Sequence, residues 1–338
     1  MGDNNEVVFH PVLINSLFAE HNVLDFLEII CGQSLFNVKI SYQMFKASRV
    51  TLLIVILAPT LYFFTSCNDD LDGSVKLTGT RLDIMTMLSS DDITQRATID
   101  SDNFRFVSRE GVIVRGGPSS FVFTEGGTEV VGMIDFEFTE LFSKSDILQY
   151  GITTQTYKAI LESDGEFLFR AFQNGQELSL ATGKVLDVIV PNADPNSEME
   201  LFVPGEGFWL PNDNPLNVIV DGEPGYSFFA DRLDWVNIDY FTKFDLELTN
   251  ISFDLPEGYE DISIALFVVF RDRNIVLGTN GENLPIGEAI SIVCIAAEDE
   301  ETFRVDIQEV VVEEDLTVDL KPNRSSPEDI KTLLKTLD

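Results

Sequence analysis

Residues 166–180 read EFLFRAFQNGQELSL, and this stretch predicts a β-hairpin. Two strand-like runs flank Asn174-Gly175, a residue pair that readily adopts the two positive φ angles of a type I′ turn. The hairpin indicates a fold built from antiparallel strands.

The same period-two pattern continues on both sides of the hairpin. In the run MIDFEF, Ile134, Phe136 and Phe138 share one face and acidic residues occupy the other. Glycine-containing turn signals recur at short intervals: Gly116-Gly117-Pro118, Gly126-Gly127, Asp164-Gly165, Asp221-Gly222 and Asn280-Gly281. Short strands at this spacing predict an all-β chain rather than a parallel α/β sheet, with a first β-sandwich domain over residues 75–241.

A second β-sandwich is expected over residues 242–322. Residues 262–270 and 289–297 are apolar on both faces, as central strands are. The size and pattern fit an immunoglobulin-like sandwich without its disulfide. Cys294 lies in the second run, so we expect a buried small hydrophobic residue rather than a nucleophile.

Residues 323–338 predict a short C-terminal helix. Ser326 can cap it, Pro327 suits its first position, and acidic residues follow in the first turn. We expect its apolar stripe to dock on the second sandwich, with a partner groove as the alternative. The stripe consists of Ile330, Leu333, Leu334 and Leu337.

A secretory signal is predicted at residues 44–66. Lys46 and Arg49 precede the apolar run 50–64, which at 15 residues is shorter than the roughly 20 that a spanning helix needs. Small polar residues and Cys67 follow, and the sequence then turns acidic. We therefore expect lipidation at Cys67 and a lipidated tether over residues 67–74, with an uncleaved anchor as the alternative.

Residues 1–43 precede this signal. We expect them to be an upstream or non-native extension, because Met44 opens a conventional signal peptide. The alternative is a cytoplasmic segment, since these residues include a helix-like apolar spacing. In either case the basic flank places the chain after Cys67 outside the cytoplasm. Asp69 and Asp70 resemble the export signal of bacterial surface lipoproteins, and this resemblance implies a location at the outer membrane or cell surface.

Composition limits the chemistry of the exported part. The chain carries 57 acidic and 22 basic residues, a formal net charge of −35, so nucleic acid is not an expected partner. Both histidines, His10 and His21, precede the signal, which excludes histidine-based triads and zinc sites from the exported part. Only one cysteine follows Cys67, so no intrachain disulfide is expected there, and no cofactor or metal is predicted.

Several segments resemble surface lipoproteins of Bacteroidetes with tandem β-sandwich domains. The resemblance rests on residues 140–190, with ELFSKSDIL and AFQNGQEL, and on residues 226–241, YSFFADRLDWVNIDYF. It extends through Leu284-Pro-Ile-Gly287 and Ser326-Pro-Glu-Asp-Ile-Lys331 and covers most of residues 98–337. That group has no agreed activity. A fainter likeness to the β-sandwich beside death domains in netrin receptors and ankyrins favours binding or mechanical roles by analogy.

Three functions are compatible with these observations. The first is a non-catalytic module that binds a glycan or an envelope protein, with Trp209, Tyr226, Trp235 and Tyr240 as candidate stacking aromatics; alternatively these rings fill a core. The second is a glycan-active enzyme that uses paired carboxylates, for which no sequence feature selects a pair. The third is a stalk or assembly subunit of an envelope complex. We expect the first, without catalysis.

Overall fold

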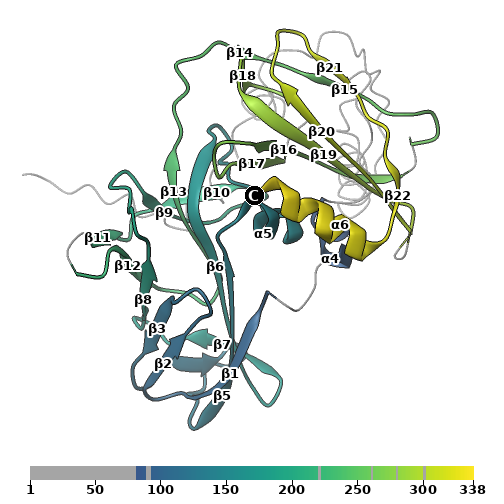
Figure 1. Ribbon diagram of the computed structural model, residues 1–338. Helices are drawn as coiled ribbons and strands as arrows, with labels where there is room; N and C mark the ends of the chain where they lie inside the picture. The colour runs from purple at the N-terminus through teal and green to yellow at the C-terminus, as the bar shows by residue number, and fades with distance from the viewer. Residues whose placement is uncertain (1–80, 89–92, 220–221, 260–261, 279–280, 300–301) are drawn as a thin grey trace, which may run out of the picture. The chain divides into compact units, whose positions relative to one another are not determined.

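The computed structural model describes residues 81–88, 93–219, 222–259, 262–278, 281–299 and 302–338. They belong to one compact unit that spans Gly73–Asp338. Residues 1–43, the predicted signal peptide, Cys67 and the tether lie outside the described residues. The described residues form mostly antiparallel strands in several sheets, with a short C-terminal helix, as the sequence predicts (Figure 1).

An eight-stranded sheet forms the first layer of the described structure. The predicted hairpin joins β6 and β7, and its turn residues Asn174 and Gly175 have φ angles of 53° and 77°. These left-handed angles explain the Asn-Gly pair. The strand order is β1 (Gln95–Asp100), β5 (Met133–Leu141), β6 (Leu161–Gln173), β13 (Trp235–Phe241), β9 (Glu200–Pro204) and β10 (Trp209–Asn212), with β7 (Gln176–Leu180) and β4 (Phe121–Phe123) beside β6.

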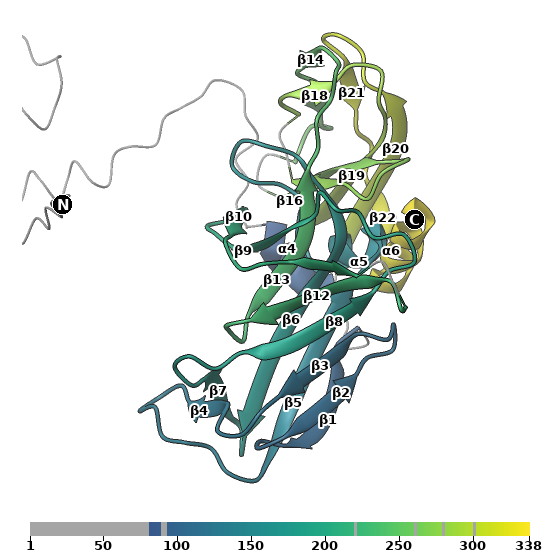
Figure 2. The ribbon, with the colours of Figure 1, turned by 90° about the vertical axis from the view of Figure 1, so that its left-hand side faces the viewer.

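A five-stranded sheet packs against the inner face of this first sheet. Phenylalanines from both sheets meet in the core between them, among them Phe106, Phe138 and Phe228. Figure 2 shows β8, β12 and β3 layered over β5, β6 and β13. The strand order is β11 (Asn217–Ile219), β12 (Gly225–Ala230), β8 (Leu186–Pro191), β3 (Ile113–Gly116) and β2 (Phe104–Val107).

A second five-stranded sheet is built from the C-terminal part of the chain. Its central strands coincide with the two apolar runs of the sequence, and Cys294 is fully buried among them, as predicted. Burial raises the pKa of the Cys294 thiol to about 12. The strand order is β17 (Val276–Gly278), β16 (Ser263–Phe270), β19 (Ala289–Ala297), β20 (Phe303–Val311) and β22 (Asn323–Ser325).

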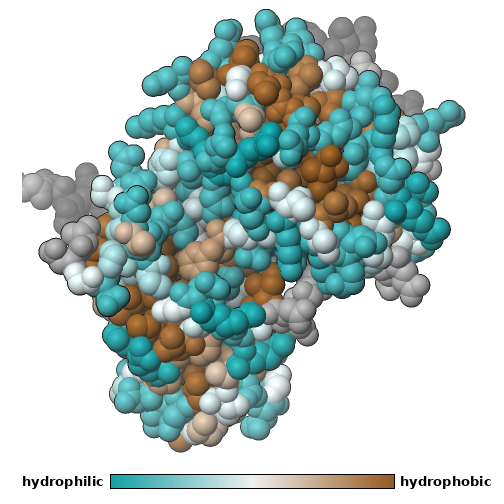
Figure 3. Space-filling model, viewed as in Figure 1, coloured by the Kyte–Doolittle hydropathy of each residue, from teal (hydrophilic) through white to brown (hydrophobic). Residues whose placement is uncertain are grey.

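Both faces of this C-terminal sheet are covered. Two small sheets cover one face: β14 (Leu248–Thr249) pairs with β18 (Leu284–Pro285), and β15 (Ser252–Asp254) pairs in parallel with β21 (Thr317–Asp319). Three helices cover the other: α4 (Arg81–Leu88), α5 (Lys144–Gln149) and α6 (Pro327–Leu334), which continues into η2 (Lys335–Leu337) (Figure 1). The chain thus has two layered parts: the pair of sheets around the phenylalanine core, and the C-terminal sheet with its covers. Figure 3 shows exposed apolar side chains on each layered part, with hydrophilic side chains around them.

The C-terminal helix begins where the sequence predicts it. The Ser326 hydroxyl accepts a hydrogen bond from the Asp329 amide, and Ile330 and Leu334 are buried against the C-terminal sheet. Leu333 of the expected stripe is instead 39% exposed. No helix of the described segments is long and apolar enough to cross a membrane.

One hydrophobic cluster crosses the expected domain boundary at residue 242. Strand β13 does end there, at Phe241. However, Leu141, Ile147 and Leu148 share a core cluster with Phe267 and other residues of the C-terminal sheet. Helix α5, which the sequence analysis did not predict, therefore lies in the first part of the chain but packs in the core of the second.

Candidate functional site

The outer face of the eight-stranded sheet carries many polar and charged side chains. We use this name for the side of β1, β5, β6 and β13 that points away from the phenylalanine core. Strand alternation places these residues there: Arg96, Thr98, Asp135, Glu137, Thr139, Leu141, Glu166, Leu168, Arg170, Phe172, Trp235, Asn237 and Asp239. One end of this face is open to solvent and the other is covered.

The open end contains a shallow hollow of about 430 Å³. Arg96, Thr98, Asp135, Glu137 and Phe172 line it. The Thr98 hydroxyl donates to Asp135 Oδ1 at 3.1 Å, and the guanidinium of Arg170 lies 4.8 Å from the centre of the Phe172 ring. The hollow thus combines an aromatic ring with charged groups of both signs.

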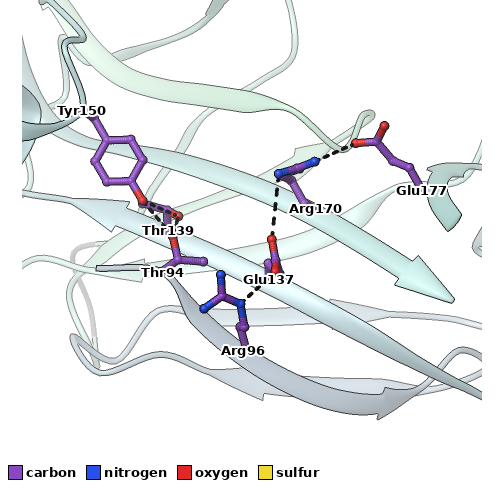
Figure 4. Close-up of polar contacts among 7 residues, drawn as sticks. All are labelled: Thr94, Arg96, Glu137, Thr139, Tyr150, Arg170 and Glu177. Atoms are coloured by element: carbon purple, nitrogen blue, oxygen red, sulfur yellow. Dashed lines mark hydrogen bonds and ion pairs between the residues drawn. The ribbon is translucent and has the colours of Figure 1, made fainter. Parts of the chain in front are cut away.

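A ladder of ion pairs crosses the sheet beside the hollow (Figure 4). Arg96 Nε donates to Glu137 Oε1 at 2.9 Å, and Arg170 Nη1 lies 4.0 Å from the other oxygen of Glu137. Arg170 Nη2 also lies 3.3 Å from Glu177 Oε1 on β7. Such half-exposed pairs contribute about 0–1 kcal/mol each, so their main effect is to fix the positions of these side chains.

Three hydroxyl groups mark the point where the outer face becomes covered. Thr94 Oγ1 lies 2.9 Å from Thr139 Oγ1 and 2.7 Å from the hydroxyl of Tyr150, which follows α5 (Figure 4). The Tyr150 ring in turn meets Trp235 edge-on, with the ring centres 5.6 Å apart. Tyr150 therefore links the sheet to the helix that covers it.

A buried pair of carboxyl groups lies at the covered end. Glu166 on β6 and Asp239 on β13 are both 0% exposed. Asn237, the cross-strand neighbour of Glu166, donates from Nδ2 to Asp239 Oδ2 at 2.6 Å and accepts at Oδ1 from the Ser163 hydroxyl at 3.2 Å. Both carboxylate oxygens of Glu166 and Oδ1 of Asp239 have no hydrogen-bond partner among the described residues.

Burial dominates the electrostatics of this acid pair. It raises the pKa of Glu166 well above its usual range, and the charge of Asp239 raises it further. Burial also raises the pKa of Asp239 to about 7, although the hydrogen bond from Asn237 opposes the rise. Burial therefore favours the protonated form of both carboxyl groups.

A β-bulge lies beside the acid pair. The register between β6 and β13 shifts at Ile238/Asp239, and Gly165 on the opposite strand has a φ of +145°. A Cβ at this glycine would overlap the ring of Phe167, so the residue must remain small. The shift turns Ser163 to the same face as Asp239 and Glu166.

The structure does not place the four aromatic residues predicted as stacking groups on one surface, although Trp209 and Trp235 pack in the same small apolar cluster. Trp209 and Tyr226 are 4% and 0% exposed. The Trp209 Nε1 donates to the Thr153 carbonyl at 2.6 Å, and the Tyr226 hydroxyl donates to Asp164. Neither ring is accessible to a ligand. Both fill the core, which was the alternative expected from the sequence.

Trp235 and Tyr240 are half-buried. Trp235 packs against Tyr150, and the Tyr240 hydroxyl donates to Glu162 Oε2 at 2.6 Å. Burial and the bond to Glu162 raise the pKa of Tyr240 to about 12. The four aromatic residues do not form one surface.

Sequence reasoning missed both ends of the outer face. The alternation of residues 133–138 indicated that Asp135 and Glu137 share a face, and the same reasoning extends to Arg170 and Phe172. The signal for the hollow was thus present. The burial of Glu166 and Asp239 had no such signal, because alternating polar residues normally face water.

The described residues contain no group of three or more His, Cys, Asp or Glu arranged to hold a metal ion. In the comparisons with known proteins, the chain matches no family model, no curated protein and no solved structure.

Proposed function

We propose that the chain is a lipid-anchored surface protein that faces away from the cytoplasm and has a non-catalytic binding role. The sequence around Cys67 supports the anchor. The separate apolar cores of the two layered parts support a description as two β-sandwich domains.

The hollow on the outer face is the proposed binding surface, and a glycan is the proposed ligand. The observation that carries this proposal is the solvent-accessible grouping of Phe172 with Asp135, Glu137 and Arg96. An aromatic ring offers a sugar its apolar contact, while carboxylate and guanidinium groups hydrogen-bond to hydroxyls. The ion-pair ladder holds these groups in place before binding.

Binding is tested with the full exported chain against a panel of envelope and host polysaccharides. We expect Phe172→Ala to weaken binding roughly 2- to 10-fold, the range for loss of one aromatic contact. Tyr157→Ala is the matched control, because Tyr157 is a 77% exposed aromatic outside the hollow. Equal effects of the two variants, or the absence of any binding, would remove the hollow from the proposal.

The same panel addresses the alternative functions. Release of reducing ends would favour a carboxylate-dependent enzyme, and Asp135→Asn would then abolish the release. Recovery of stoichiometric envelope proteins without glycan would favour a stalk or assembly role. The anchor is tested separately: Cys67→Ser should abolish incorporation of labelled fatty acid and release the protein from membranes, and retention of both would contradict lipidation.

A further inference from the structure

The buried acid pair Glu166–Asp239 lacks any compensating charge. Three of its four oxygens have no hydrogen-bond partner among the described residues. The charges that act on the pair are carboxylates: Asp239 acts on Glu166, and Asp164 and Glu162 act on Asp239. An ionised carboxylate in such surroundings would cost several kcal/mol, so a bound proton is the simplest way to keep the pair in the interior.

The basic groups of the surrounding elements are engaged elsewhere. Lys144 Nζ on α5 donates to the carbonyl of Arg271 at 2.8 Å, and Arg273 lies 3.4 Å from Glu162. Arg271 pairs with Glu309 at 2.9 Å. The other ionisable groups on the elements packed around the pair include Asp146 on α5, Asp164 on β6, Glu200 on β9, Tyr240 on β13 and Asp272 between β16 and β17. They also include Glu137 and Glu140 on β5, and Asp338, which accepts hydrogen bonds from Ser145 of α5.

The pair lies directly beside the contact between the first sheet and the C-terminal sheet. Ser163, the cross-strand neighbour of Asp239, donates its amide to the carbonyl of Asn274 at 3.1 Å. Asn274 returns a hydrogen bond from Nδ2 to the Ser163 carbonyl at 2.8 Å. Nearby, the Thr154 amide donates to the Val276 carbonyl at 2.7 Å. We call these contacts the joint.

We propose that Glu166 and Asp239 form a proton-binding site that locks the joint, and that loss of the protons loosens it. In the protonated state both side chains are neutral and the layer between sheet and helix stays dry. Ionisation places two negative charges on one face of two adjacent strands. The charges repel each other and favour the entry of water, and both effects weaken the hydrogen bonds of Ser163 to Asn274. The inference is independent of the proposed glycan binding. It requires only that the protein meets changing pH.

The two tryptophans of the chain provide the test. Trp235 lies on the outer face two positions before Asn237, and Trp209 packs with Leu161 of β6. We expect a reversible change in tryptophan emission of the folded exported chain, with a midpoint near pH 7, as pH rises from about 5 to about 9. Glu166→Gln and Asp239→Asn together should abolish it. Asp254→Asn, an exposed strand aspartate, is the matched control and should leave it unchanged.

Hydrogen exchange locates the change. After correction for the pH dependence of free amides, the Ser163 and Thr154 amides should exchange at least tenfold faster above the midpoint, whereas amides of β19 should not. An emission change that persists in the double variant would overturn the proposal, as would unchanged protection of the joint. If millimolar Ca²⁺ rather than protonation restores protection, the site binds a cation and the proton lock is wrong. Should the double variant not fold, the exchange experiment on the unaltered chain still decides.

Discussion

Replacing Asp239 with asparagine should flatten the pH dependence of stability. The folded-state pKa of about 7 lies above the ordinary value of 3.8, so the folded protein binds this proton more tightly than the unfolded chain does. The stabilisation is fully present below pH 3.8 and is lost as pH rises to about 7. The interval from about pH 5 to about pH 7 covers about two pH units of this range. At about 1.4 kcal/mol per unit, the free energy of unfolding falls by about 3 kcal/mol.

The assay is urea unfolding of the exported chain at about pH 5 and about pH 8.5, followed by tryptophan emission. Asparagine keeps an oxygen for the bond from Asn237, and its new amide lacks an acceptor at a cost of about 1–3 kcal/mol that is independent of pH. The variant should therefore lose about 3 kcal/mol less than the unaltered protein between the two pH values. An identical loss in both proteins would refute the buried titration of Asp239.

Three further substitutions test the packing of the fold by urea unfolding and circular dichroism. Gly225→Ala places a Cβ against the Val190 carbonyl at a φ of +156°, so a loss of at least about 3 kcal/mol or failure to fold is expected; full stability would contradict the paired geometry of β12 and β8. Trp209→Phe leaves the Thr153 carbonyl without its indole donor and should cost about 1–3 kcal/mol, whereas no cost would mean that the bond does not persist in solution. Ser326→Ala removes the cap of α6 and should cost about 1 kcal/mol, with Ser326→Asp as the variant that retains it.

Local patterns predicted those elements whose conformation depends on residues within a few positions of one another. Asn174-Gly175 defines its turn because few other residues accept two left-handed angles. The run 289–297 is apolar on both faces, and it becomes the central strand of a sheet covered on both sides. Ser326 and Pro327 mark the start of α6 by chemistry that acts within one turn.

Helix α5 shows what a local reading can overlook. Ser143 caps it, because its hydroxyl accepts from the amide of Asp146 at 3.2 Å, and this Ser-x-x-Asp spacing is present in the sequence. The helix has only six residues, however, and strand-like segments surround it. A helix of this length is stabilised by its packing rather than by its propensity, so local sequence alone does not predict it.

The acid pair could not be predicted for a different reason. Glu166 follows the polar positions of an alternating strand, and alternation indicates which residues share a face but not whether that face meets water. The cover consists of α5 and the C-terminal sheet, and the core cluster that they share extends along the chain to Leu334 of α6. Burial of Glu166 thus depends on contacts between distant segments that no local pattern encodes.

The hydrophobic cluster that crosses residue 242 limits how this protein can change by recombination. A crossover at that point would place α4 and α5 from one parent against a C-terminal sheet from the other, so Phe267 and Val293 would meet helices from a different sequence. We therefore expect exchange of either layered part alone to destabilise the protein. We expect diversity among related proteins to accumulate as point changes in the hollow and the exposed turns, not as shuffled domains.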